Sequence, residues 1–95
     1  MKIQEIKNDN EKISFSIEGD LSIYSVKELK NKLESYFENM KNIEFDLSAV
    51  DKVDTAGFQL LEMLKKELAG KDKTFSIINP SNEIIRIFNL YGEAL

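Results

Sequence analysis

One segment near the middle of the chain limits the fold more than any other. Alternating apolar residues from Asn42 to Leu47 predict a buried strand, and a short polar bend follows it. Asp54 and Thr55 then begin an amphipathic helix whose leucines recur at helical spacing as far as Leu68. A helix N-terminus carries unpaired N–H groups and the positive end of the helix dipole, so a hydroxyl there lies where an anion is tolerated. The segment therefore predicts a polar site at the start of a helix.

The spacing of apolar residues predicts the other elements. Strict alternation predicts a strand over Lys12–Glu18 that Gly19-Asp20 breaks, and the turn Asn8-Asp9-Asn10 joins it in a hairpin to a strand over Met1–Lys7. Two further strands are predicted, over Asn42–Leu47 and Thr74–Ile78, and two helices, over Ser25–Met40 and Asp54–Leu68. A last helix is predicted to start at Asn79-Pro80-Ser81, with the proline in its first turn, and to stop at Gly92. This β-β-α-β-α-β-α order predicts one α/β domain over residues 1–95, with a mixed sheet, right-handed parallel crossovers and helices mainly on one face.

The composition removes several kinds of chemistry. The chain has no cysteine and no histidine, which excludes thiol catalysis, disulfides, zinc sites built on these residues and imidazole acid–base catalysis. The net charge of −4 disfavours nucleic acid or an anionic membrane as the main partner. Residues 1–5 contain no apolar h-region and the apolar runs are short, so we expect no signal peptide, no membrane insertion and a cytoplasmic location.

The acidic residues and serines give only weak signals of a catalytic or metal site. Asp46, Asp51 and Asp54 are close in sequence but lack the regular spacing of a calcium loop, and a helix cap at Asp54 with a solvated turn residue at Asp51 is the simpler interpretation. Ser48 and Ser81 have no histidine base. The four glycines form no phosphate-binding loop. We therefore expect no enzyme activity, no cofactor and no metal.

Thr55 has two interpretations. In the first, the hydroxyl of Thr55 or the carboxylate of Asp54 only caps the helix. In the second, the Thr55 hydroxyl is a phosphoacceptor or a contact at a protein interface. Gly57 favours a special role, because glycine in a helix costs about 1 kcal/mol relative to alanine and implies the close approach of another backbone. Phe58 lies either partly exposed beside Thr55 or at the edge of the core. The pair Ile23-Tyr24 is expected to pack under the first helix, although its loop could lie next to Thr55.

Four motifs carry a family resemblance: Gly19-Asp20-Leu21-Ser22-Ile23-Tyr24, Asp46-Leu47-Ser48, Asp54-Thr55-Ala56-Gly57-Phe58 and Asn79-Pro80-Ser81. Through them the chain resembles, essentially end to end, the STAS domain of bacterial anti-sigma factor antagonists. In phosphorylatable members the residue after the motif aspartate accepts phosphate from a partner kinase that is also an anti-sigma factor. The resemblance implies this role for Thr55. The unmodified protein would bind the kinase and free the sigma factor, and phosphate would weaken that complex.

The resemblance also implies a surface and leaves two functions open. The implied partner-binding residues are Asp20, Ser22, Ile23, Asp54, Thr55, Ala56, Gly57 and Phe58. Many antagonists carry an acidic residue at the position of Ser22, and a serine at that of Thr55. Asp-Thr-Ala-Gly is closer to a second branch, which includes proteins associated with chemotaxis kinases and an accessory subunit of a phospholipid-transporting ABC system. In that accessory subunit the equivalent threonine lies at the contact with the ATPase and need not be phosphorylated. The alternative is thus a constitutive adaptor.

Overall fold

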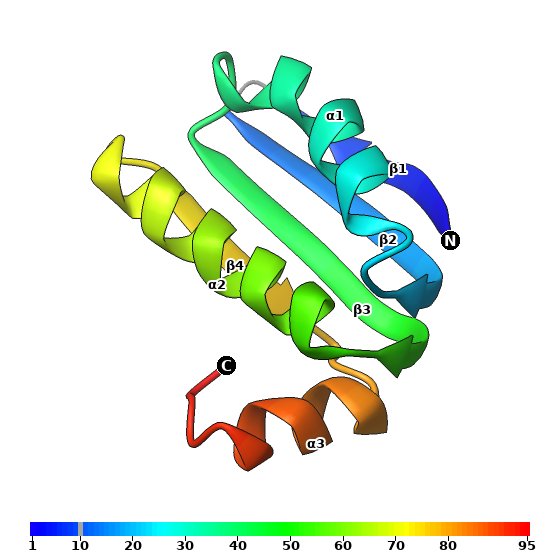
Figure 1. The fold of residues 1–95 in the computed structure, drawn as a ribbon. Helices are drawn as coiled ribbons and strands as arrows, with labels where there is room; N and C mark the ends of the chain where they lie inside the picture. Colours follow the sequence, from blue (N-terminus) through cyan, green and yellow to red (C-terminus); the bar gives the residue numbers. More distant parts are fainter. Residues whose placement is uncertain (10) are drawn as a thin grey trace.

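The computed structural model describes residues 1–9 and 11–95, apart from the side chain of Phe37, and Asn10 of the predicted turn lies outside the described residues. Its elements are β1 (Lys2–Asn8), β2 (Lys12–Leu21), α1 (Val26–Phe37), β3 (Asn42–Val53), α2 (Thr55–Gly70), β4 (Thr74–Ile78) and α3 (Asn82–Leu90), as Figure 1 shows. The predicted order of elements is confirmed.

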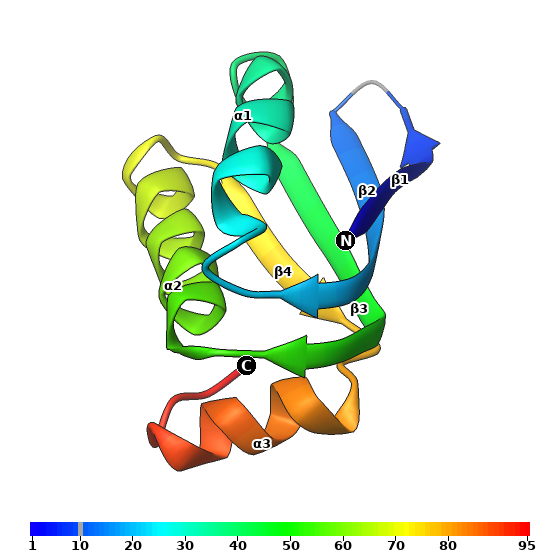
Figure 2. The same ribbon diagram turned by 45° about the vertical axis from the view of Figure 1, so that its right-hand side comes forward.

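The four strands form one mixed sheet in the order β1-β2-β3-β4. β1 pairs with β2 in antiparallel fashion, whereas β2 with β3 and β3 with β4 are parallel pairs. In both views α1 and α2 lie over the same face of the sheet (Figure 1, Figure 2). β1 and β4 are the edge strands. Because β2 and β3 are adjacent and parallel, their carboxyl ends are neighbours, and the loops that follow them are brought together there.

The two central strands are longer than predicted. The prediction that Gly19-Asp20 breaks the strand is wrong: β2 continues to Leu21, and a register shift against β3 falls between these two residues. Gly19 has φ +88°, which glycine adopts without strain. The predicted polar bend after Leu47 is also strand, and Asp51 is an exposed strand residue rather than a turn residue. Each extension is stabilised by pairing with the other, which a local pattern does not reveal.

The core lies between the sheet and the helices. Phe45 on the central strand is fully buried and makes edge-on contacts with Phe15 and Phe75, at centroid distances of 6.1 and 4.9 Å. From α2 the buried leucines are Leu60, Leu61, Leu64 and Leu68. The apolar stripe predicted for this helix therefore faces the sheet.

α3 packs where β3 extends past β4. β4 pairs only with Asn42–Asp46, and the rest of β3 has α3 beside it (Figure 2). Ser81 is the N-cap of α3, so Pro80 precedes the helix rather than lying in its first turn as predicted. The N–H of Ser81 donates to the carbonyl of Leu47 at 3.2 Å, which fixes the start of α3 to the middle of β3.

α1 begins one residue later than predicted, with Ser25 at its N-cap position, and ends at Phe37, three residues before the predicted end. Among residues 1–9 and 11–95, the helices are too short or too polar to cross a lipid bilayer.

Candidate functional site

The carboxylate of Asp54 organises the start of α2. Its Oδ1 accepts a hydrogen bond from the N–H of Gly57 at 2.9 Å, which confirms the predicted helix cap. Its Oδ2 accepts from the N–H of Ile23 at 3.0 Å, across 31 positions of sequence. One side chain thus caps the helix and holds the loop after β2 against it.

Gly57 is where α2 meets the end of β2. A Cβ atom on this glycine would lie 2.1 Å from the carbonyl oxygen of Leu21, closer than any side chain can approach. The N–H of Asp54 donates to the same carbonyl at 3.3 Å. The expectation that Gly57 permits the close approach of another backbone is confirmed.

The loop after β2 turns its apolar side chains outward. Ser25 accepts from the N–H of Ser22 at 2.9 Å, and its hydroxyl lies 2.8 Å from the carbonyl oxygen of Asp20. With its backbone held in this way, the loop leaves Ile23 63% and Tyr24 93% exposed. The expectation that this pair packs under the first helix is therefore wrong. The other expectation, that the loop lies next to the start of the second helix, is correct.

Thr55, the first residue of α2, is exposed but has a partner within the chain. Its Oγ1 lies 2.8 Å from the hydroxyl oxygen of Tyr91, and either atom can donate. The ring of Tyr91 stacks on Phe58 with a centroid distance of 4.6 Å and an interplanar angle of 16°. Phe58 also contacts Phe88 edge-on at 4.9 Å and is only 7% exposed, so it belongs to the core.

A shallow hollow of about 370 Å³ adjoins this site. It is lined by Asp20, Ser22, Tyr24, Lys52, Val53, Asp54, Glu83 and Arg86. Three predicted site residues therefore meet there, together with charged residues that the sequence did not single out. Arg86 and Glu83 form an ion pair at 2.9 Å on the rim. Ala56, by contrast, faces a different hollow between α1 and α2.

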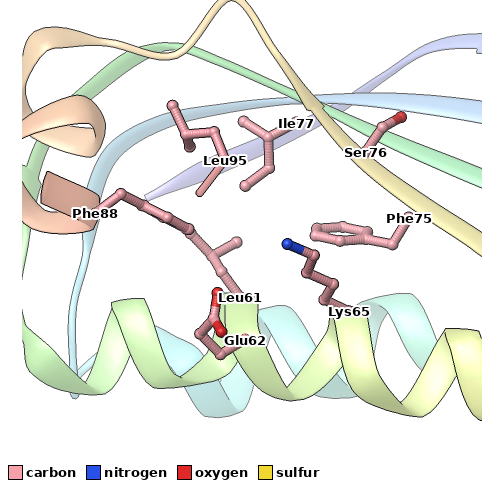
Figure 3. A pocket seen from close by; sticks show the side chains of 8 residues that line it. All are labelled: Leu61, Glu62, Lys65, Phe75, Ser76, Ile77, Phe88 and Leu95. Atoms are coloured by element: carbon pink, nitrogen blue, oxygen red, sulfur yellow. The ribbon is translucent and has the colours of Figure 1, made fainter. Parts of the chain in front are cut away.

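A third hollow, of about 140 Å³, lies between α2 and β4 (Figure 3). Its lining is mostly apolar, from Leu61, Phe75, Ile77, Phe88 and Leu95, with Glu62, Lys65 and Ser76 beside them. Phe88 lines this hollow and also contacts Phe58, so it connects the hollow to the aromatic cluster beside Thr55.

The three aspartates considered as metal ligands serve separate roles. Asp46 accepts from the N–H of Ser48 at 3.0 Å and from Nδ2 of Asn79 at 3.1 Å, and these hydrogen bonds, led by that from the Ser48 backbone, lower the pKa of the Asp46 carboxyl below its ordinary 3.8. Asp51 is exposed on β3, and Asp54 caps α2. Across the part of the chain that the structure describes, no three acidic side chains gather as a candidate metal site.

Tyr91 is the member of the site that sequence reasoning missed. Nothing in the sequence pattern linked it to Thr55, which lies 36 positions away. The only available signal was a tyrosine at a helix end, whose ring packs and whose hydroxyl needs a partner.

The STAS domain family matches residues 2–94. Among solved structures, the anti-sigma factor antagonist SpoIIAA in its unphosphorylated form is 19% identical, with a TM-score of 0.79 over 96% of this chain and 81% of that one. The phosphorylated form of SpoIIAA, described as a Bacillus cell fate determinant, is 19% identical and has a TM-score of 0.75 over 96% of this chain and 84% of that one. An anti-sigma factor antagonist from Mycobacterium paratuberculosis is 19% identical and has a TM-score of 0.79 over 96% of this chain and 79% of that one. At this identity the likeness establishes the shared fold.

Proposed function

The chain belongs to the STAS domain family, and we propose that it is a non-enzymatic regulatory module that binds another protein through the start of α2. The observation that carries the proposal is the hydroxyl of Thr55, an exposed residue at the first position of a 16-residue helix. Beside it lie two exposed apolar residues, Ile23 and Tyr24, held there by the carboxylate of Asp54. Exposed aromatic and apolar residues around a polar centre are typical of protein interfaces.

The proposed binding surface has an outer and a supporting part. Asp20, Ser22, Ile23, Asp54, Thr55 and Ala56 would contact the partner. Gly57 and Phe58 are buried and would act from below, Gly57 by bringing the helix to β2 and Phe58 by carrying Tyr91. We add Tyr24 to the predicted set, because its side chain is almost fully exposed.

The leading partner is a serine/threonine kinase-type anti-sigma factor, with Thr55 as the phosphoacceptor. In that step a bond forms between Oγ1 of Thr55 and the γ-phosphorus of a nucleoside triphosphate, the β,γ-phosphoanhydride bond breaks, the hydroxyl proton passes to a base, and a nucleoside diphosphate leaves. The helix N-terminus tolerates the new charge in the free protein. In a complex the dianion would lose its hydration, which weakens binding. The structural similarity to antagonists in both unphosphorylated and phosphorylated forms supports this proposal.

The alternative is a constitutive adaptor of the chemotaxis or lipid-transport type, whose partner would be a chemotaxis component or a transport ATPase. The motif Asp54-Thr55-Ala56-Gly57 favours it, since alanine follows the hydroxyl residue. In this case Thr55 is an unmodified contact. Genes for a kinase and a sigma factor beside the gene of this protein would favour the switch, and genes for transporter subunits or chemotaxis proteins the adaptor.

Phosphate mapping tests the switch. The protein is incubated with ATP and the kinase encoded beside it, and the modified residue is identified by mass spectrometry. Phosphate on Thr55 is the expected result, whereas phosphate confined to other residues would contradict the switch.

Substitution of Thr55 then separates the two functions. Thr55→Asp weakens partner binding in both cases, because the added charge must be desolvated. Asn82→Asp is the matched control, since it adds the same charge at the first residue of α3, and it should leave the affinity unchanged. Thr55→Ala keeps binding under the switch and loses regulation. Under the adaptor it weakens binding by about 1 kcal/mol, the value of a hydrogen bond that the partner had matched.

The fold should survive each Thr55 variant because Asp54 still caps α2, and circular dichroism checks this. Binding is measured by titration calorimetry. A Thr55→Ala protein that unfolds, with no separate effect on binding, would make Thr55 a structural residue and end both proposals.

A further inference from the structure

Tyr91 is held in place by the way α3 ends. The N–H of Glu93 donates to the carbonyl of Phe88 at 2.9 Å, and the N–H of Gly92 donates to that of Asn89 at 3.1 Å. These two bonds, with Gly92 at φ +67°, form a Schellman motif, in which the residue before the glycine is the C-cap of the helix. Tyr91 is that residue. The turn therefore fixes the backbone from which its side chain reaches α2.

Two contacts then fix the side chain of Tyr91 itself. The ring stacks on Phe58, and the hydroxyl lies at hydrogen-bond distance from Oγ1 of Thr55. Phe58 is buried, but Tyr91 remains 45% exposed. The stack faces solvent on one side, so the side chain of Tyr91 can rotate away without opening the core.

We propose that Tyr91 is an intramolecular cap on Thr55, so that a partner or a phosphoryl donor reaches this hydroxyl only after the Tyr91 side chain moves away. This inference rests on the proposed function of Thr55, but its structural half can be tested without any partner. Tyr91 is a positioning residue here, since it acts through Thr55.

Reaction at Oγ1 of Thr55 depends on its lone pairs and on the space around it. A phosphoryl donor needs a free lone pair on this oxygen and room for a tetrahedral group beside it. With the Tyr91 hydroxyl 2.8 Å away, one direction of approach is occupied. Removing that hydroxyl frees the oxygen, and removing the whole ring also clears the space. Tyr91→Phe and Tyr91→Ala therefore separate the hydrogen bond from the steric cover.

A single engineered thiol measures this cover directly. The chain has no cysteine, so Thr55→Cys introduces a unique thiol at the capped position. The thiolate attacks an aromatic disulfide, a mixed disulfide forms, and a coloured aromatic thiolate leaves, which gives the reaction rate. We expect about a two-fold higher rate when Tyr91→Phe is added, the effect of one weak net hydrogen bond. We expect about a five-fold higher rate with Tyr91→Ala, because this substitution also removes the steric cover.

Asn82→Cys provides the matched control thiol, on the first residue of α3. Its rate should not respond to either Tyr91 substitution. If Tyr91→Ala accelerates the reaction of both thiols, α3 has loosened. The test of the cap is then the comparison of the Thr55→Cys rate with tyrosine and with phenylalanine at position 91. Equal rates at Thr55→Cys with tyrosine and phenylalanine at position 91 would overturn the hydrogen-bonded cap.

Fluorine NMR of the fluorotyrosine-labelled protein tests the same contact from the other side. The chain has three tyrosines, of which Tyr24 is 93% exposed and Tyr36 packs edge-on against Phe15, so these two serve as internal references. Thr55→Val should shift the Tyr91 resonance alone, and Thr55→Ser, which keeps the hydroxyl, should restore it. An unmoved Tyr91 resonance in Thr55→Val would show that the contact is absent in solution.

The two proposals fail in distinguishable ways. If the Tyr91 resonance responds to Thr55 but phosphate and partner contacts fall elsewhere, the proposed function is wrong and the contact is a packing feature. If Thr55 is modified or bound as proposed while neither the thiol rate nor the resonance depends on Tyr91, the cap alone is wrong.

Discussion

At the position of Gly57, the backbones of α2 and β2 come into direct contact. The helix is brought to the strand because no Cβ separates them, and Asp54 adds a hydrogen bond to the same carbonyl of Leu21. This contact puts the loop that carries Ile23 beside Thr55. Residue-level reasoning reached the correct cause, since a glycine in the first turn of a helix needs a reason other than helix propensity.

Alanine at this position should therefore be strongly unfavourable. In Gly57→Ala the new Cβ would lie 2.1 Å from the carbonyl oxygen of Leu21, so helix and strand must move apart. We expect a loss of about 2 kcal/mol or more in the free energy of unfolding, within the range of overpacked cores. Urea unfolding followed by circular dichroism measures it.

Gly70→Ala is the matched control for that substitution. It makes the same change at the other end of the same helix, where a Cβ would meet nothing within 4 Å. Alanine there should be neutral or stabilise the protein by up to about 1 kcal/mol through its helix propensity. Equal effects at the two glycines would contradict the close approach at Gly57.

Among the elements, α3 connects its own last turn to the start of α2. Its first turn is capped by Ser81, which accepts from the N–H of Ile84 at 3.3 Å, and its last turn ends in the Schellman motif at Gly92. The helix is only nine residues long, so its two ends strongly influence its stability.

Gly92→Ala should loosen that last turn. A residue with a Cβ pays about 1–2 kcal/mol in the left-handed conformation that Gly92 adopts at φ +67°. We expect a similar loss of stability and a Tyr91 fluorine resonance displaced toward that of the exposed Tyr24. Glu93→Ala, at the next and equally exposed position, should do neither. A Tyr91 resonance that is unchanged in Gly92→Ala would separate the cap from the helix end.

The elements also show where sequence reasoning reaches its limit. Existence and order of every helix and strand followed from periodicity, but β2 and β3 were ended too early. From Gly19 onward, β2 pairs with β3 through Gly19 with Val50, Asp20 with Lys52 and Leu21 with Val53. Register shifts in this stretch interrupt the alternation that marks a strand. The polar residues of this stretch therefore resembled a bend, because the partner strand that pairs with them is remote in sequence.

The candidate site divides in the same way. Asp54, Gly57 and the helix start were predictable because capping and close approach are local demands of a helix. Tyr91 was missed, since its contact with Thr55 depends on how α3 packs against α2. The outward turn of Ile23 was also missed, because it follows from hydrogen bonds between the loop and the helix cap.

At the scale of the whole molecule, Asp46 joins β3 to the turn after β4. It accepts hydrogen bonds from the Ser48 backbone and side chain and from Nδ2 of Asn79, whose backbone has φ +48°. The chain reverses from β4 into α3 at this turn. The carboxylate therefore holds the connection that determines where α3 starts.

This arrangement predicts how stability depends on pH. Hydrogen bonds to the charged form lower the pKa of Asp46 in the folded protein below the ordinary value of 3.8. The unfolded chain thus takes up the proton first as the pH falls, so the contribution of Asp46 to stability is complete above about pH 5 and is lost as the pH falls below 4 through the folded pKa. Asp46→Asn removes this ionisation. The variant should be less stable than the parent at pH 7, and the difference should shrink steadily below pH 4 in urea unfolding curves.

Asp51→Asn, on the exposed side of the same strand, controls for the loss of one negative charge. A stability difference for Asp46→Asn that stays constant from pH 7 to pH 3 would mean that the Asp46 carboxylate is not held in its charged form by Ser48 and Asn79.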